Sequence, residues 1–334
     1  MTNLNMITCT QADVAALRDH STAEITDRLA AMQHQESTSF CPTDYLNGHD
    51  FSTGFQEEHR VSREKMCAWC HHLVDMTELS RLTVSRAMNC LDRFLATSHK
   101  RAQLALHDRQ DYQLAAMTSL YICLKIHEST PVEASLLAEI SEGCYITEDI
   151  LDMERCMLEA LEWRVNGPTP QEFVSNILGL ATTEIVEHDL DTLGSLLDVS
   201  LFQCELAAID YDLSMCKPSI IALASVLNSL DGMMDAEEAS TDECTFLVRV
   251  CHVIAGNVYM SEVELAQARL RRMVRQNSGE DEMLQETTFT TYEEYEPESH
   301  EGSNHIMETP ESSPNSIKKT IDKISSPVSA AARF

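Results

Sequence analysis

The chain has few of the residues that make turns and sheets. Among its 334 residues are only 10 glycines and 9 prolines, and aromatic residues make up 6%. Gly and Pro supply most tight turns, and glycine-rich loops bind phosphate groups through their backbone. Their scarcity disfavours a sheet-rich fold and a nucleotide-binding loop. Hydrophobic residues nevertheless make up 43% of the chain, so we predict an all-α protein with sizeable cores.

Positive charge is also scarce. The chain holds 24 Lys and Arg residues against 54 Asp and Glu residues, a net charge of −30. Such a charge repels nucleic acid and anionic membranes, so we expect neither as a partner. No apolar run approaches 18 residues, and the first residues lack the basic-then-apolar pattern of a signal peptide. We therefore expect a protein of the nucleus and cytoplasm with reduced thiols.

The pattern along the chain predicts four segments. Residues 1–55 form a leader, with one amphipathic helix expected over 11–33. Residues 56–166 and 167–278 are two helical blocks of similar length, each with about five apolar stripes at helical spacing. Residues 279–334 are an acidic tail rich in Ser, Thr and Pro with little aliphatic pattern, which is typical of disorder.

One short motif suggests chemistry. Cys67, Cys70 and His71 spell C-x-x-C-H, the attachment signature of a c-type haem, and C-x-x-C also occurs in zinc and thiol-redox sites. A zinc site needs a second ligand pair, and a redox site needs a preceding strand; the sequence indicates neither. We interpret both cysteines as core residues of a helix. Since no other catalytic motif is present, we expect a non-enzyme without cofactor or metal.

The helix that contains this motif resembles the start of a known domain. The string SREKMCAWC (62–70), with Arg63 six residues before Trp69, is similar to the first helix of the cyclin box. AMNCLDRFL (87–95) resembles the second helix. Further along, 113–131 and 149–163 resemble the third and fifth helices. The resemblance covers about residues 56–275, and 202–227 is most similar to the D-type (G1) cyclins.

The resemblance implies a fold and a function. The fold is two stacked five-helix cyclin domains, and the function is to bind a cyclin-dependent kinase and hold its αC helix inward, at the G1/S transition. Lys125 and Glu154 match the pair that bonds to each other and to the kinase. Arg63 and Asp92 match an internal salt bridge. Two-cyclin-fold transcription factors and cyclins of transcriptional kinases are the alternatives. The acidic charge disfavours the first, which would bind DNA.

A substrate-docking patch is a further implication of the resemblance. Some cyclins bind an R-x-L motif through an apolar patch on the first helix and a Gln of the third. Met66, Trp69 and Gln113 match that patch. Ser62 and Lys65 depart from it, because both replace apolar residues.

Two short motifs in the terminal segments suggest other partners. Cys9 is the centre of a sequence similar to the L-x-C-x-E motif that binds retinoblastoma-like proteins, although both flanking identities differ. Thr309 and Ser313, within Thr-Pro-x-x-Ser, resemble the phosphodegron of unstable cyclins. Phosphorylation there would create an anionic target for a ubiquitin ligase receptor.

Overall fold

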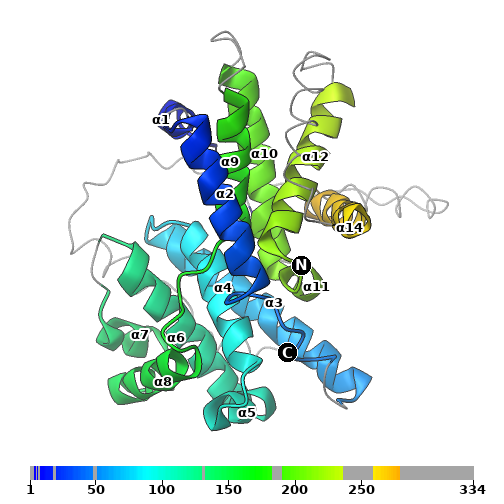
Figure 1. The fold of residues 1–334 in the computed structure, drawn as a ribbon. Coiled ribbons are helices and arrows are strands. Elements are labelled where there is room, and N and C mark those ends of the chain that lie inside the picture. Colours follow the sequence, from blue (N-terminus) through cyan, green and yellow to red (C-terminus); the bar gives the residue numbers. More distant parts are fainter. Residues whose placement is uncertain are drawn as a thin grey trace, which may run out of the picture.

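The computed structural model shows the helical protein that the composition predicts. It describes residues 4, 6, 8–17, 20–47, 51–129, 132–182, 190–235 and 259–278. These residues form helices and no strand, which confirms the all-α prediction. The helices make two stacked bundles, one above the other in Figure 1. The predicted tail, with Thr309 and Ser313, lies outside the described residues.

The first bundle surrounds a central helix, α6. The helices α3, α4, α7 and α8 pack with it, and the short α5 connects α4 to α6; their bounds are α3 Thr53–Met76, α4 Leu82–Leu95, α5 Lys100–His107, α6 Arg109–His127, α7 Ala134–Ile140 and α8 Thr147–Ala160. Every side chain of α6 from Tyr112 to Leu124 is buried, as expected for a helix with neighbours on all sides. Asp108 separates α5 from α6, because its carboxylate accepts the Asp111 backbone N–H at 2.9 Å and caps α6.

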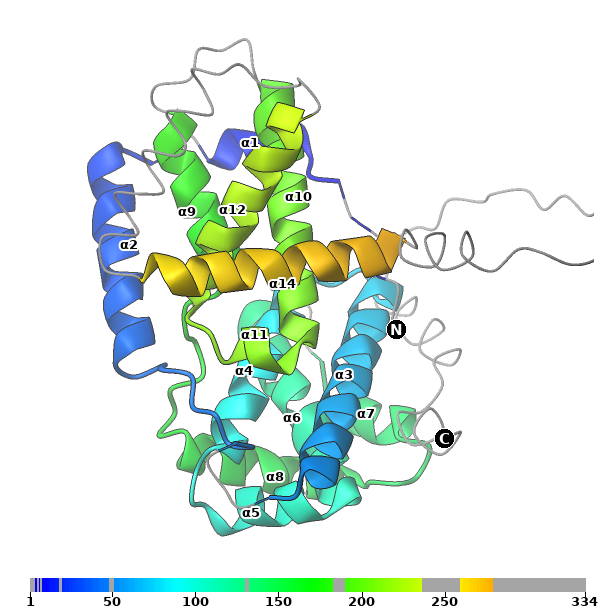
Figure 2. The ribbon, with the colours of Figure 1, turned by 90° about the vertical axis from the view of Figure 1, so that its right-hand side faces the viewer.

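The second bundle follows after a short linker. Its described helices are α9 Pro170–Thr182, α10 Leu190–Ile209, α11 Tyr211–Ser214, α12 Pro218–Asp235 and α14 Met260–Ser278. Pro170 and Pro218 open α9 and α12, where a missing backbone N–H costs no hydrogen bond. Helix α14 crosses α10 and α12 (Figure 2) and buries its apolar stripe against the bundle core.

Helix α10 is unusually apolar. Of the described helices it is the one, over Asp191–Ile209, that is long and apolar enough to cross a membrane by length and composition. Half of this stretch is buried, with Leu193, Leu196 and Leu197 in the second core. Contacts with α9, α12 and α14 on several sides therefore account for its apolar character.

The leader differs from the prediction of one helix over 11–33, which was wrong. The structure has two helices, α1 Gln11–Ala16 and α2 Thr22–Ser37. The second begins at a capping box, in which Ser21 accepts the Glu24 backbone N–H and the Glu24 carboxylate accepts the Ser21 backbone N–H. Both helices bury apolar side chains in the second bundle's core, and α2 lies along α9 (Figure 1).

Candidate functional site

Lys125 and Glu154 form an ion pair between the end of α6 and the middle of α8. Lys125 Nζ lies 2.6 Å from Glu154 Oε1, and it also lies 5.2 Å from the centre of the Tyr121 ring. The Lys125 side chain is 52% exposed, whereas that of Glu154 is 10% exposed. The hydrogen bond to Glu154 raises the pKa of Lys125, so the ammonium stays charged. The pair therefore presents a fixed cation at the protein surface.

Exposed aliphatic side chains lie on the same two helices. Ile126 follows Lys125 and is 46% exposed, and Leu151 precedes Glu154 by one helical turn and is 44% exposed. Ile146, just before α8, is also exposed. Apolar side chains beside an oriented charge are typical of a protein-binding surface, since the first contribute affinity and the second fixes orientation. We call Lys125, Glu154, Ile126 and Leu151 the α6–α8 surface.

Arg63 and Asp92 form a second ion pair, in the interior. Arg63 Nε and Nη2 donate to the two Asp92 carboxylate oxygens at 2.9 and 2.8 Å, and the side chains are 1% and 6% exposed. Burial alone would lower the pKa of Arg63, but the Asp92 charge outweighs it and the net shift is upward. This pair connects α3 to α4, as the resemblance implied.

The same guanidinium also connects the two bundles, which the sequence did not predict. Arg63 Nη1 donates to the backbone oxygens of Ala208 and Ile209, at the end of α10, at 2.8 and 3.0 Å. The Tyr45 hydroxyl, from the leader, donates to Asp92 at 3.2 Å. Leader, first bundle and second bundle therefore meet at one buried charge.

The leader contacts this junction through Asp44, Tyr45 and Leu46. The Tyr211 hydroxyl donates to Asp44 at 2.8 Å and accepts the Leu46 backbone N–H at 3.1 Å. The Tyr45 and Tyr211 rings meet edge to face, with centroids 5.3 Å apart. Sequence reasoning missed these contacts, because no spacing rule connects residues more than 160 positions apart. The only available hint of this contact was the presence of Tyr45 and Tyr211 in a chain that has few aromatic residues.

The three residues of the predicted docking patch are buried. Met66, Trp69 and Gln113 are 4%, 6% and 5% exposed. The Tyr145 hydroxyl donates to Gln113 Oε1 at 3.4 Å, so the Gln113 amide already has a partner inside the protein. Trp69 belongs to the first core, because its ring packs among the helices of that bundle. Substrate docking at this patch stays a prediction.

The C-x-x-C-H motif lies in the core, as interpreted from the sequence. Cys67 and Cys70 are fully buried free thiols, and burial raises the pKa of Cys67 to about 12. A thiol with this pKa stays protonated at neutral pH and is a poor nucleophile. Among the described residues, no group of three His, Cys, Asp or Glu side chains could hold a metal ion.

Cys9, the centre of the proposed retinoblastoma-binding motif, contacts the second bundle. Its backbone N–H donates to Asp198 on α10 at 2.6 Å, and the residue is partly buried. This segment is held against α10 in the chain alone. Its binding to a retinoblastoma-like protein therefore stays a prediction, as do the roles of Thr309 and Ser313.

Comparison with known proteins supports the resemblance. Residues 27–166 match the family described as "Cyclin, N-terminal domain", a range that takes in part of α2 as well as the first bundle. The chain is 30% identical over 179 residues to G2/mitotic-specific cyclin-2 of Antirrhinum majus, covering 53% of this chain and 37% of that relative. It is 30% identical over 218 residues to Cyclin-B2-2 of Arabidopsis thaliana, covering 64% and 44%. The matches thus span less than half of either relative.

A solved structure shows the same fold. The X-ray structure of a viral cyclin from herpesvirus saimiri aligns with a TM-score of 0.51 at 16% identity, covering 76% of this chain and 98% of that one. The two relatives are named as G2/mitotic and B-type cyclins, so they give the predicted D-type character no support.

Proposed function

We propose that the chain binds and activates a cyclin-dependent kinase through the α6–α8 surface, because residues 27–166 match the cyclin N-terminal domain. The observation that carries the proposal is the ion pair of Lys125 and Glu154, oriented at 2.6 Å on two helices that also carry exposed aliphatic side chains. The chain would hold the kinase's αC helix inward, so that the kinase's own Lys–Glu pair aligns on ATP. The chain itself would perform no chemistry.

The chemistry of the pair suits recognition of backbone. An ammonium group has three N–H donors, and the bond to Glu154 uses one of them. Because half of the Lys125 side chain is exposed, it can also donate to carbonyl groups at the end of a partner helix. Leu151 and Ile126 would bury apolar area around this contact.

A charge swap tests the surface. Lys125→Glu with Glu154→Lys keeps an attractive pair but reverses the charge presented to the kinase. We expect at least a tenfold loss of affinity for a purified cyclin-dependent kinase, which corresponds to about 1.4 kcal/mol, with unchanged helicity. The measurements are a pull-down and the rate of peptide phosphorylation by the kinase. Retained binding by the swapped chain would overturn the proposed interface.

A matched control lies on the same helix. Asp152 and Arg155 form an exposed pair at 2.9 Å on α8, with side chains 74% and 65% exposed. Swapping these two charges alters the surface of α8 without touching Lys125 or Glu154. We expect the Asp152→Arg, Arg155→Asp chain to bind the kinase as the unmodified chain does. Equal losses of kinase affinity in both swaps would mean that binding depends on the overall charge of α8 and not on the Lys125–Glu154 pair.

The stage of the cell cycle follows from a different argument. The resemblance of 202–227 to D-type cyclins suggests G1/S, but the names of the relatives favour G2 and mitosis. We therefore propose a mitotic role. The chain's abundance in synchronised cells decides between them: a maximum at G2/M supports the mitotic role, whereas a maximum in G1 supports the D-type reading.

Other expected properties remain proposals. Turnover through a ubiquitin ligase receptor predicts that Thr309→Ala with Ser313→Ala lengthens the chain's half-life in cells. Binding of a retinoblastoma-like protein predicts that Cys9→Ala lowers its capture. A kinase regulator of this kind would act in both nucleus and cytoplasm, which fractionation of cells tests directly.

A further inference from the structure

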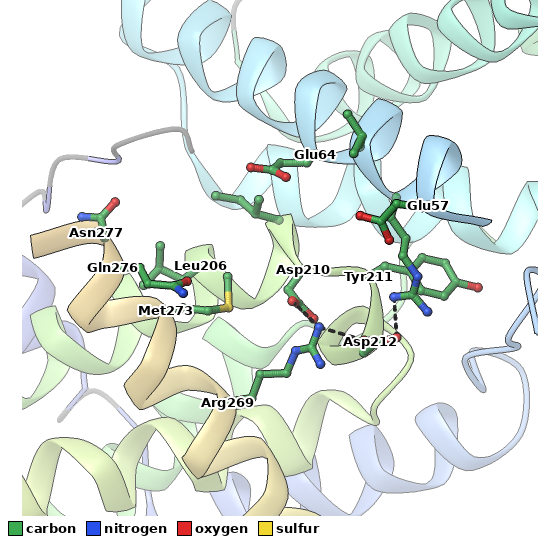
Figure 3. A pocket seen from close by; sticks show the side chains of 13 residues that line it. Glu57, Glu64, Leu206, Asp210, Tyr211, Asp212, Arg269, Met273, Gln276 and Asn277 are labelled. Carbon is green, nitrogen blue, oxygen red and sulfur yellow. Dashed lines mark hydrogen bonds and ion pairs between the residues drawn. The ribbon is translucent and has the colours of Figure 1, made fainter. Parts of the chain in front are cut away.

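A groove of about 380 Å³ lies between the two bundles, on a face formed by α3, α11 and α14. Figure 3 shows Glu57 and Glu64 on α3 facing Asp210, Asp212 and Arg269 across it. The groove is separate from the α6–α8 surface, since it uses neither of those helices. Its function is therefore a separate question from kinase binding.

The groove carries excess negative charge. Arg269 bonds to Asp210 and Asp212 at 2.7 Å each, and Arg60 pairs with Asp212 as well. On the opposite wall, Glu57 and Glu64 receive no hydrogen bond or ion pair from the described residues. The groove therefore holds four carboxylates but only two guanidinium groups. The two carboxylates without a partner, those of Glu57 and Glu64, lie together on α3. Such a site favours a cationic occupant.

The groove also has an apolar lining. Leu206, Ile209, Met273 and the exposed Val61 supply apolar lining. At one end, the Asn277 amide contacts a segment of the chain's own leader. Leu4 N–H donates to Asn277 Oδ1 at 3.0 Å, and Asn277 Nδ2 donates to the Leu4 oxygen at 3.1 Å. This edge of the groove thus already bonds to the backbone of one leader residue, Leu4, which is buried.

We propose that residues 317–324 of the chain's own tail, IKKTIDKI, dock in this groove. Residues 279–316 contain no Lys or Arg, so Lys318, Lys319 and Lys323 are the first cations after α14. Ile317, Ile321 and Ile324 recur at i, i+4 and i+7. The lysines would pair with Glu57 and Glu64, and the isoleucines would cover the apolar lining. The groove is thus a docking site for a basic, aliphatic segment.

The connection allows this contact within one molecule. Helix α14 ends with Asn277 and Ser278 at the edge of the groove, and 38 residues lie between Ser278 and Ile317. By random-coil scaling, a connection of that length has an end-to-end distance of roughly 35 Å, which gives an effective concentration in the millimolar range. Docking in the same chain is therefore favoured over docking in a second copy at micromolar concentration.

Lysine acetylation of the full-length chain, followed by mass spectrometry, tests the proposal. We expect Lys318, Lys319 and Lys323 to react at least threefold more slowly than the exposed Lys100 at low salt. The protection should disappear at about 0.5 M salt, because exposed charge pairs are screened. The double change Glu57→Gln with Glu64→Gln should abolish this protection of the tail lysines. The matched control is Glu58→Gln, which removes a neighbouring exposed charge outside the groove and should leave it intact.

Zero-length amine–carboxylate cross-linking gives the location. The proposal expects links from the three tail lysines to Glu57 or Glu64 within one copy, identified with a mixture of isotopically light and heavy chains. The proposal would be overturned if the tail lysines reacted as fast as Lys100. It would also be overturned if Glu58→Gln removed the protection as fully as Glu57→Gln with Glu64→Gln. Links that join light to heavy copies would overturn it too, because the segment would then be docking in a second molecule.

Discussion

Two ion pairs connect helices of the first bundle, and they differ mainly in burial. In each, the basic and acidic residues are 29 positions apart in the chain. Arg63 and Asp92 are 1% and 6% exposed and are surrounded by further hydrogen bonds. Lys125 is 52% exposed, and Glu154 offers it one short bond at the edge of the protein. The same chemistry thus occurs once inside and once at the surface.

The difference shows which pair serves the fold. Removing two charges from water costs several kcal/mol per ion, and only close geometry with additional hydrogen bonds offsets that cost. The Arg63 junction has these bonds, to Ala208, Ile209 and Asp92. An exposed pair contributes little to stability because water solvates each charge well without the other. The exposed pair is therefore available for a partner, whereas the buried pair holds the bundles together.

The largest expected effect follows from breaking the buried pair. Arg63→Ala leaves Asp92 buried without its main partner and removes two bonds to the second bundle. We expect a loss of about 3–5 kcal/mol in the free energy of unfolding. Chemical denaturation followed by circular dichroism measures it. Arg155→Ala, in an exposed pair, is the matched control and should leave the free energy of unfolding nearly unchanged.

A double replacement separates charge from packing. Arg63→Met with Asp92→Leu removes both charges and keeps apolar volume in the junction. Because no charge then remains buried and unpaired, we expect this chain to be more stable than Arg63→Ala. If the double variant is the less stable of the two, the pair's charges themselves, rather than the loss of one partner, determine stability.

His71, another residue of α3, extends the comparison, because it is buried without a partner. His71 is 1% exposed, and no described residue bonds to either ring nitrogen. Burial lowers its pKa to about 4 from 6.5. Between these values the unfolded chain binds a proton that the folded chain does not, so stability falls as pH decreases from 6.5 towards 4. We expect His71 to account for up to about 3 kcal/mol of that fall.

Replacing His71 tests this pH dependence. His71→Phe removes the titrating group and keeps an aromatic ring of similar size. The slope of unfolding free energy against pH between 6.5 and 4 should decrease in this variant, while His72→Phe, on the exposed side of α3, should leave it unchanged. An unchanged slope in His71→Phe would show that His71 is protonated in the folded chain.

Tyr45→Phe has a smaller effect on the same junction. The change removes the hydroxyl that donates to Asp92 at 3.2 Å but keeps the ring against Tyr211. Because Arg63 still donates to both Asp92 oxygens, we expect a loss of about 1–2 kcal/mol by chemical denaturation. Tyr121→Phe, whose ring lies beside Lys125, is the control from the exposed pair and should cost less.

The sequence predicted the helical fold and both ion pairs, and particular residues show why it could not go further. Helical spacing and the match of Arg63, Asp92, Lys125 and Glu154 to a family pattern are local signals, which a single sequence carries. The bonds from Arg63 to the end of α10 depend on how two bundles stack, and no periodicity encodes that. Trp69 matched the docking patch of the family, but a helical pattern alone does not distinguish a buried ring from an exposed one.

The smallest change in stability is expected from Lys125→Ala, in the exposed pair. Lys125→Ala removes the exposed cation, and because solvent reaches this pair, we expect the free energy of unfolding to change by less than about 1 kcal/mol. Kinase binding should nevertheless fall at least tenfold, since the partner loses a charged donor. Arg63→Ala should show the opposite ratio, with a large loss of stability and kinase binding that follows the folded fraction. A Lys125→Ala chain that is destabilised as strongly as Arg63→Ala would mean that the α6–α8 pair is part of the fold.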